Sequence, residues 1–229
     1  MRSIPILARG SSVLGAAAAL GAVAVIWAAR LTVEGTVYVS ELGSPALPTA
    51  EAFNAALLVL AAGGVLAGLG ALGQRSATRW LGRWSIAASL VTSGLAFLVA
   101  SRVPCTAGCP VPFTEGATAQ DLVHVVTAVI GFAAAAWAML QTAFGDGSRP
   151  LRVLSRLAAI AVALIAAVGG LLSVLQFRTD IGATMEFTAM SVAVLWLAGF
   201  ALSNAVRPLR AAGPLRAAGP LRAELDAER

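Results

Sequence analysis

Charged residues divide this chain into six long stretches that carry no charge and consist mainly of Ala, Leu, Val, Gly and Ile. The stretches are 18 to 24 residues long. A bilayer core about 30 Å thick needs roughly 20 helical residues at about 1.5 Å each, whereas a membrane β-barrel needs alternating strands of about 10 residues. The pattern therefore predicts an all-α membrane domain over residues 1–206. Its six transmembrane helices are expected at about 11–29, 52–74, 84–101, 122–145, 157–177 and 187–206.

The composition agrees with a membrane protein and excludes most other classes. The 229 residues are 59% hydrophobic and 12% charged, whereas a soluble domain is about 45–50% apolar and about 25% charged. Two cysteines and the absence of a Gly repeat exclude disulfide scaffolds and collagen.

The first apolar stretch has an alternative interpretation as a cleaved signal peptide. Arg2 and Arg9 precede it, and Ala22-Val23-Ala24 is an acceptable processing site. However, the apolar run continues to Ala29, which is longer than a signal core of about 7–15 residues. We therefore expect this helix to be retained.

The arginines predict the orientation of the helices. All sixteen basic residues are Arg, and thirteen of them fall on one side of the predicted membrane. Only Arg30, Arg102 and Arg178 fall on the other side. By the positive-inside rule, we expect a protein of the plasma (inner) membrane with both termini in the cytoplasm. Arginines at helix ends meet anionic headgroups, so membrane lipids rather than nucleic acid are the expected partners.

Residues 207–229 are expected to form a disordered cytoplasmic tail rich in Arg and Pro. The sequence AAGPLR occurs twice there, at 211–216 and 217–222. Repeated prolines prevent a continuous helix. A regulatory partner site in the tail is the alternative interpretation.

Two long connections, at residues 30–51 and 102–121, are expected to be ordered loops on the exterior face. The first contains a β-branched and aromatic segment, 32–40, that favours a short strand. The second contains Cys105 and Cys109, and an exterior loop permits a disulfide between them. Metal binding or a redox role is the alternative, but two thiols without a neighbouring His make a poor zinc site.

Small residues are frequent within the predicted helices. Gly64 and Gly68 form a GxxxG pair, and Gly169-Gly170 lies in the fifth stretch. Such residues let two helices approach closely. We interpret them as sites of packing within one chain, with homo-oligomer formation as the alternative.

Ionisable residues gather at the exterior ends of the predicted helices, and none lies near the middle of a span, which argues against an ion-coupled transporter. Asp121 and His124, spaced i, i+3, share a helical face. We expect a polar pocket at the level of the outer headgroups, formed by Glu41, Asp121, His124, Arg178, Glu186 and Arg30. Each residue also has a structural explanation: Asp121 as a helix cap, His124 as a hydrogen-bond partner and the arginines as ion-pair partners.

The chemistry expected of this pocket is limited. One histidine is too few for a hydrolytic metal site, and neither a GxSxG elbow nor a P-loop occurs. We therefore predict no catalytic residues, no metal and no cofactor.

Several short motifs resemble landmarks of the bacterial and archaeal membrane family called domain of unknown function 998. They are the segment 39–45 with Phe53-Asn54, the sequence Cys105-x-x-x-Cys109-Pro110, and residues 121–124. The resemblance extends over most of residues 12–206 and implies a six-helix membrane protein, but it implies no reaction. The first exterior loop is also similar to that of eukaryotic autophagy-modulator-type membrane proteins.

The leading functional hypothesis is a non-enzymatic membrane protein whose outer polar pocket binds a lipid headgroup or stabilises a membrane-protein partner. A small-molecule transporter or channel is the first alternative. The second is an intramembrane lipid hydrolase that uses His124 with Asp121 or Glu41.

Overall fold

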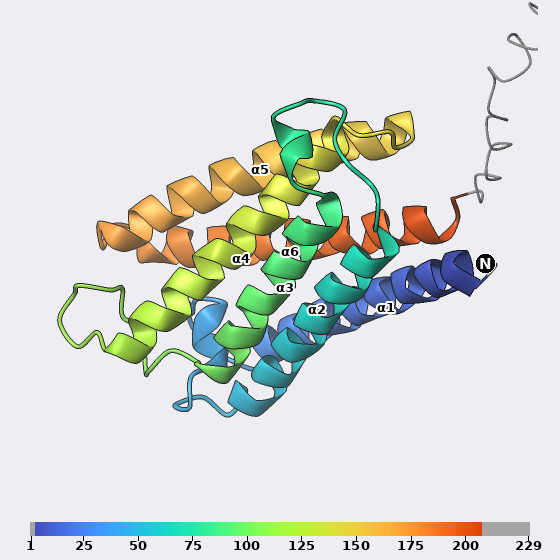
Figure 1. Ribbon diagram of the computed structural model, residues 1–229. Coiled ribbons are helices and arrows are strands. Elements are labelled where there is room, and N and C mark those ends of the chain that lie inside the picture. Colours follow the sequence, from blue (N-terminus) through green and yellow to red (C-terminus); the bar gives the residue numbers. More distant parts are fainter. Residues whose placement is uncertain (1–2, 208–229) are drawn as a thin grey trace, which may run out of the picture.

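The computed structural model describes residues 3–207 and forms an all-α bundle (Figure 1). The tail predicted at 207–229 lies outside these residues, apart from Arg207. No strand occurs in this part of the chain, so the predicted fold class is confirmed. The helices are α1 (Ser3–Leu31), α2 (Ala50–Gly70), α3 (Ile86–Arg102), α4 (Ala119–Ala143), α5 (Arg149–Val174) and α6 (Thr179–Ala205), with 3₁₀ turns η1 (Ser40–Gly43) and η2 (Leu81–Arg83).

Each helix packs against the next one along the chain, and α6 packs back against α1, so the bundle closes on itself. Within the described residues, five helices are long and apolar enough to cross a membrane. The shorter α3 has 17 residues, about 26 Å at 1.5 Å per residue. On α5, large apolar side chains at 157, 160, 164, 168 and 171 are exposed. A large exposed apolar face is unfavourable in water, which agrees with a membrane-embedded helix.

Several helices extend past the charged residues that limited the predicted spans. The first turns of α5 contain Arg149, Arg152 and Arg156, and α6 begins at Thr179 instead of 187. A helix continues beyond the hydrocarbon core, where charges meet headgroups and water, so uncharged runs underestimate its length. As a consequence, Glu186 lies about two turns inside α6 and does not open it.

The predicted strand at 32–40 is wrong. This segment runs through turns and bends into η1, because no neighbouring strand offers its backbone a ladder of hydrogen bonds.

The bundle has two distinct ends. We call the end that holds the connections 32–49, 103–118 and 175–178 the loop end. The opposite end, the arginine-rich end, holds the start of α1, the end of α6 and the connections 71–85 and 144–148. Arg9 Nη2 donates to the Arg207 carbonyl at 2.8 Å, so both described termini lie together there.

Small residues bring the helices close together within the chain. A Cβ on Gly64 of α2 would lie 3.5 Å from Gly94 Cα of α3, and one on Gly68 would lie 3.1 Å from the Ala87 carbonyl oxygen. A Cβ on Gly169 of α5 would lie 2.9 Å from Met185 Cβ of α6. The GxxxG pair therefore packs α2 against α3, as expected of intramolecular contacts.

Candidate functional site

Asp121 joins the start of α4 to the loop that precedes it. Thr118 is the N-cap of α4 and forms a capping box with Asp121. The Asp121 carboxylate accepts from the Thr118 N–H at 2.9 Å and hydroxyl at 2.7 Å, and from the Thr106 N–H at 2.7 Å. Asp121 is completely buried. Its oxygens are occupied by these donors, so Asp121 has a structural role in capping α4, as the N3 partner of the N-cap Thr118.

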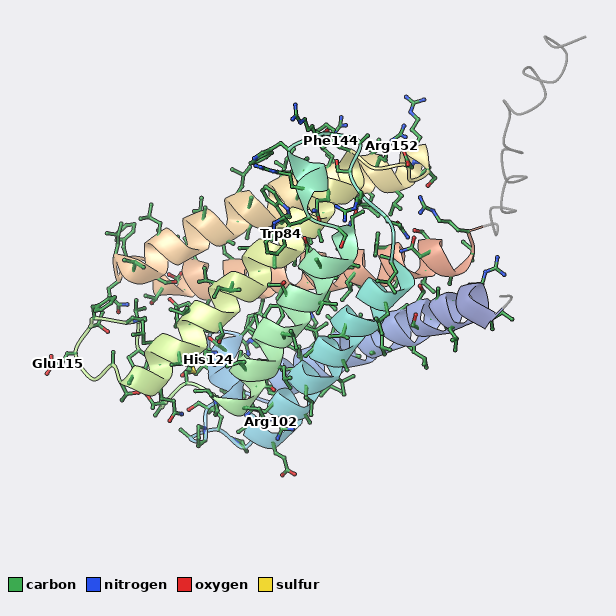
Figure 2. The ribbon with its side chains drawn as sticks, viewed as in Figure 1. Trp84, Arg102, Glu115, His124, Phe144 and Arg152 are labelled. Atoms are coloured by element: carbon green, nitrogen blue, oxygen red, sulfur yellow. A yellow bond between two sulfur atoms is a disulfide. The ribbon has the colours of Figure 1, made fainter. Side chains whose placement is uncertain are left out.

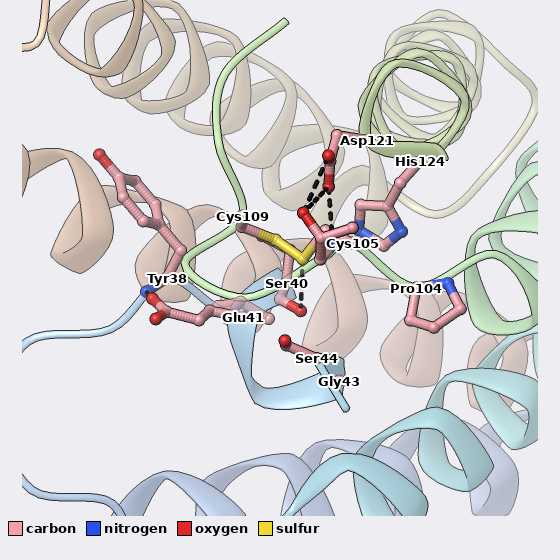
Figure 3. Close-up of a disulfide and its surroundings, with 12 residues drawn as sticks. Tyr38, Ser40, Glu41, Gly43, Ser44, Pro104, Cys105, Cys109, Asp121 and His124 are labelled. Atoms are coloured by element: carbon pink, nitrogen blue, oxygen red, sulfur yellow. Dashed lines mark hydrogen bonds between the residues drawn. A yellow bond between two sulfur atoms is a disulfide. The ribbon is translucent and has the colours of Figure 1, made fainter. Parts of the chain in front are cut away.

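Cys105 and Cys109 form a disulfide, with their Cα atoms 5.1 Å apart (Figure 3). Cys105 Sγ lies 3.5 Å from the Ser40 carbonyl oxygen, which brings the connections 32–49 and 103–118 into contact. His124 is distant from the two cysteines in sequence but close to them in the fold. A ring nitrogen of His124 and the two sulfur atoms lie within 4.8 Å of one another. Metal ions bind cysteine in its thiolate form. Cys105 and Cys109 form a disulfide, so they offer no thiolate to a metal.

His124 is almost fully buried at the loop end of α4 (Figure 2). Its Nδ1 lies 2.8 Å from the Val103 carbonyl oxygen. Among the described residues, no hydrogen bond joins His124 to Asp121 or Glu41. The His–carboxylate pair that the hydrolase hypothesis requires is therefore not assembled in this structure.

Two glutamates hold the connection 32–49. Glu186 Oε2 of α6 accepts from the Val39 N–H at 3.1 Å, and Glu41 Oε2 accepts from the Tyr38 N–H at 3.3 Å. These carboxylates thus provide hydrogen-bond acceptors for backbone N–H groups of the loop, which has no neighbouring strand to provide them.

The two predicted arginines form their hydrogen bonds outside this cluster, although the Arg30 guanidinium lies 5.8 Å from the centre of the Phe187 ring, next to Glu186. Arg178 and Asp180 form an exposed ion pair at 3.2 Å. This hydrogen bond raises the pKa of the Arg178 guanidinium above its ordinary value. Arg30 donates to the Val33 carbonyl at 2.8 Å and the Gly35 carbonyl at 2.7 Å. Both side chains therefore have structural partners, and the six predicted residues do not form one pocket.

An apolar cavity of about 70 Å³ lies inside the bundle. Residues of α1, α2, α3, α4 and α6 line it, and its polar groups include Glu186, His124, Ser40 and Ser93. The first three belong to the loop end, so Glu186 and His124 are the two predicted residues that share a cavity. The apolar lining was missed by the sequence reasoning, because a residue beside a cavity has the same apolar pattern as one in a filled core.

Comparison with known protein families gives a match over most of the chain. The family model described as "Protein of unknown function (DUF998)" matches residues 16–203, which confirms the resemblance of the sequence motifs. No curated protein matches the chain. No solved structure matches it either.

Proposed function

The chain belongs to the DUF998 family of proteins of unknown function, and from this premise we propose that it is a non-enzymatic membrane protein that binds a lipid-like amphipathic molecule. The proposed ligand places a hydrocarbon chain in the apolar cavity and its polar head at the loop end. The observation that carries this proposal is the cavity itself, which combines apolar walls with two ionisable side chains at one end.

The dimensions of the cavity favour a linear ligand. On α4 its lining extends from His124 to Ala135, and on α6 from Glu186 to Leu197. Eleven residues correspond to about 16 Å along a helix at 1.5 Å per residue. A volume of only about 70 Å³ over that length describes a narrow slot. The slot must widen to admit a hydrocarbon chain, because ligand pockets commonly have volumes of about 300–1,000 Å³. An extended chain requires less widening than a compact ring.

The loop end favours a head that offers hydrogen-bond donors. The Glu186 carboxyl group offers oxygens that accept hydrogen bonds, and a His ring nitrogen accepts or donates according to its tautomer. An ammonium or hydroxyl head satisfies these groups, whereas a fully methylated ammonium lacks an N–H to donate. We therefore expect phosphatidylethanolamine to bind more tightly than phosphatidylcholine.

The test is native mass spectrometry of the purified chain with dioleoyl-phosphatidylethanolamine and dioleoyl-phosphatidylcholine. The wild type should retain the first lipid at least tenfold better, and Glu186→Gln should lose most of this preference. Glu115→Gln, an exposed change at the same end, should keep it. Equal retention of both lipids by the wild type would overturn the proposal. Solute flux in proteoliposomes would instead support a transporter, and lipid turnover would support a hydrolase.

We further propose that the arginine-rich end faces the cytoplasm of a plasma-membrane protein. Thirteen of sixteen arginines support this orientation through the positive-inside rule, and the disulfide at the opposite end fits an oxidising exterior. Reporters fused to the two termini should both be active only on the cytoplasmic side. Reporters active on opposite sides would contradict the proposed topology. The mass spectra also report whether a second copy or a membrane-protein partner remains bound.

A further inference from the structure

A second and larger cavity, of about 580 Å³, lies at the arginine-rich end. Ligand pockets commonly have volumes of about 300–1,000 Å³. It is formed where the start of α1, the end of α2 and the end of α6 meet the two short connections at that end. Its lining shares no residue with that of the apolar cavity.

The charged groups of this cavity are mainly positive. Arg9, Arg75 and Arg207 line it together with one carboxylate, that of Asp146. Backbone carbonyls hold the guanidinium groups in place: Arg207 Nη2 donates to the Asp146 carbonyl at 3.1 Å, and Arg75 Nη1 donates to the Gly82 carbonyl at 2.9 Å. A guanidinium has five N–H donors, so each keeps donors for another partner.

Two buried donors in the cavity lack a partner within the described residues. Asn204 is only 7% exposed, and while its Oδ1 accepts from Gln74 Nε2 at 3.1 Å, its Nδ2 has no acceptor. Arg9 Nε is likewise buried without an acceptor. Buried donors are normally paired, and an unpaired one in a native structure calls for an explanation. An acceptor supplied by a ligand explains both.

We propose that this cavity binds the phosphate group of an anionic ligand. Phosphate oxygens accept several hydrogen bonds at once and suit the planar fork of arginine. Basic pockets between membrane helices on the cytoplasmic side commonly hold anionic lipid headgroups. The same chemistry binds inorganic phosphate, so the test separates the two sources.

The decisive variant is Asn204→Asp. It keeps the size of the side chain and the oxygen that accepts from Gln74, but it replaces the unpaired donor with a negative charge that repels phosphate. Arg207→Gln is a second variant that removes a positive charge. Arg79→Gln, an exposed arginine at the same end that does not line the cavity, is the control with the same loss of charge.

The measurement is thermal unfolding in detergent at constant ionic strength, with chloride, inorganic phosphate or dioleoyl-phosphatidylglycerol added. Wild type and Arg79→Gln should be stabilised by phosphate or by the lipid, whereas Asn204→Asp and Arg207→Gln should bind at least tenfold more weakly. Stabilisation by phosphate indicates a soluble anion, and stabilisation by the lipid alone indicates a headgroup. No stabilisation of the wild type by either, or equal binding by all variants, would overturn the proposal.

Discussion

Asp121 accepts hydrogen bonds from both the backbone N–H and the hydroxyl of Thr106, fifteen residues earlier in the chain. Because Thr106 follows Cys105 directly, one buried carboxylate holds the disulfide loop against the start of α4. The residue that sequence reasoning proposed for a binding pocket thus acts mainly as the anchor of that loop.

Replacement of Asp121 by Ala should destabilise the protein by about 3 kcal/mol. A lost helix cap costs about 1 kcal/mol, and the loss of the charged interaction with Thr106 costs about 1.5–3 kcal/mol. Chemical unfolding in detergent measures the change in the free energy of unfolding. Glu115→Ala, in the same loop and exposed, should change it by less than about 0.5 kcal/mol. Equal effects of both substitutions would contradict the anchoring role.

Gly94→Ala tests the close approach of α2 and α3. A Cβ at Gly94 would lie 2.7 Å from the Ala61 carbonyl oxygen, so the helices must separate to admit it. We expect a loss of about 1–3 kcal/mol, the usual cost of overpacking. At Gly21, by contrast, a Cβ meets nothing within 4 Å, so Gly21→Ala should be neutral or stabilising. A Gly94→Ala protein as stable as the wild type would exclude this close packing.

Ser155→Ala tests a buried hydrogen bond between α5 and α6. Trp196 Nε1 donates to Ser155 Oγ at 2.9 Å, and without Ser155 the indole N–H loses its acceptor. Hydrogen bonds between membrane helices contribute about 0.6–1.7 kcal/mol, and the loss of stability should fall in this range. Ser203→Ala removes only a bond to the Phe200 carbonyl of its own helix and serves as the control. If both variants unfold alike, the interhelical bond contributes nothing.

The disulfide predicts a clear labelling pattern. Alkylation of the unfolded chain followed by mass spectrometry should modify neither Cys105 nor Cys109 before reduction and both after it, since no other cysteine exists. Material that is alkylated twice without a reductant would show that the bond is not formed in the cell.

The candidate site was only partly predictable. Asp121 and His124 were paired correctly on one helical face, because i, i+3 spacing is a local property of a helix. Their partners were not predictable: Thr106, Val103 and the disulfide reach them through the fold of a loop. Arg30 and Arg178 are expected beside them, but each forms its hydrogen bonds with residues close to it in sequence.

The sequence by itself determined that this is an all-α bundle whose apolar stretches are long enough to span a bilayer. The physical reason is that charged side chains and backbone groups without hydrogen bonds are costly in the lipid core, so a spanning segment must be an uncharged helix. Only the tertiary structure decided that Glu186 and His124 border one cavity and that Arg9, Arg75 and Arg207 border another. These groups come from helices and connections far apart in the chain. Their proximity depends on how side chains of different helices pack, which no local pattern encodes.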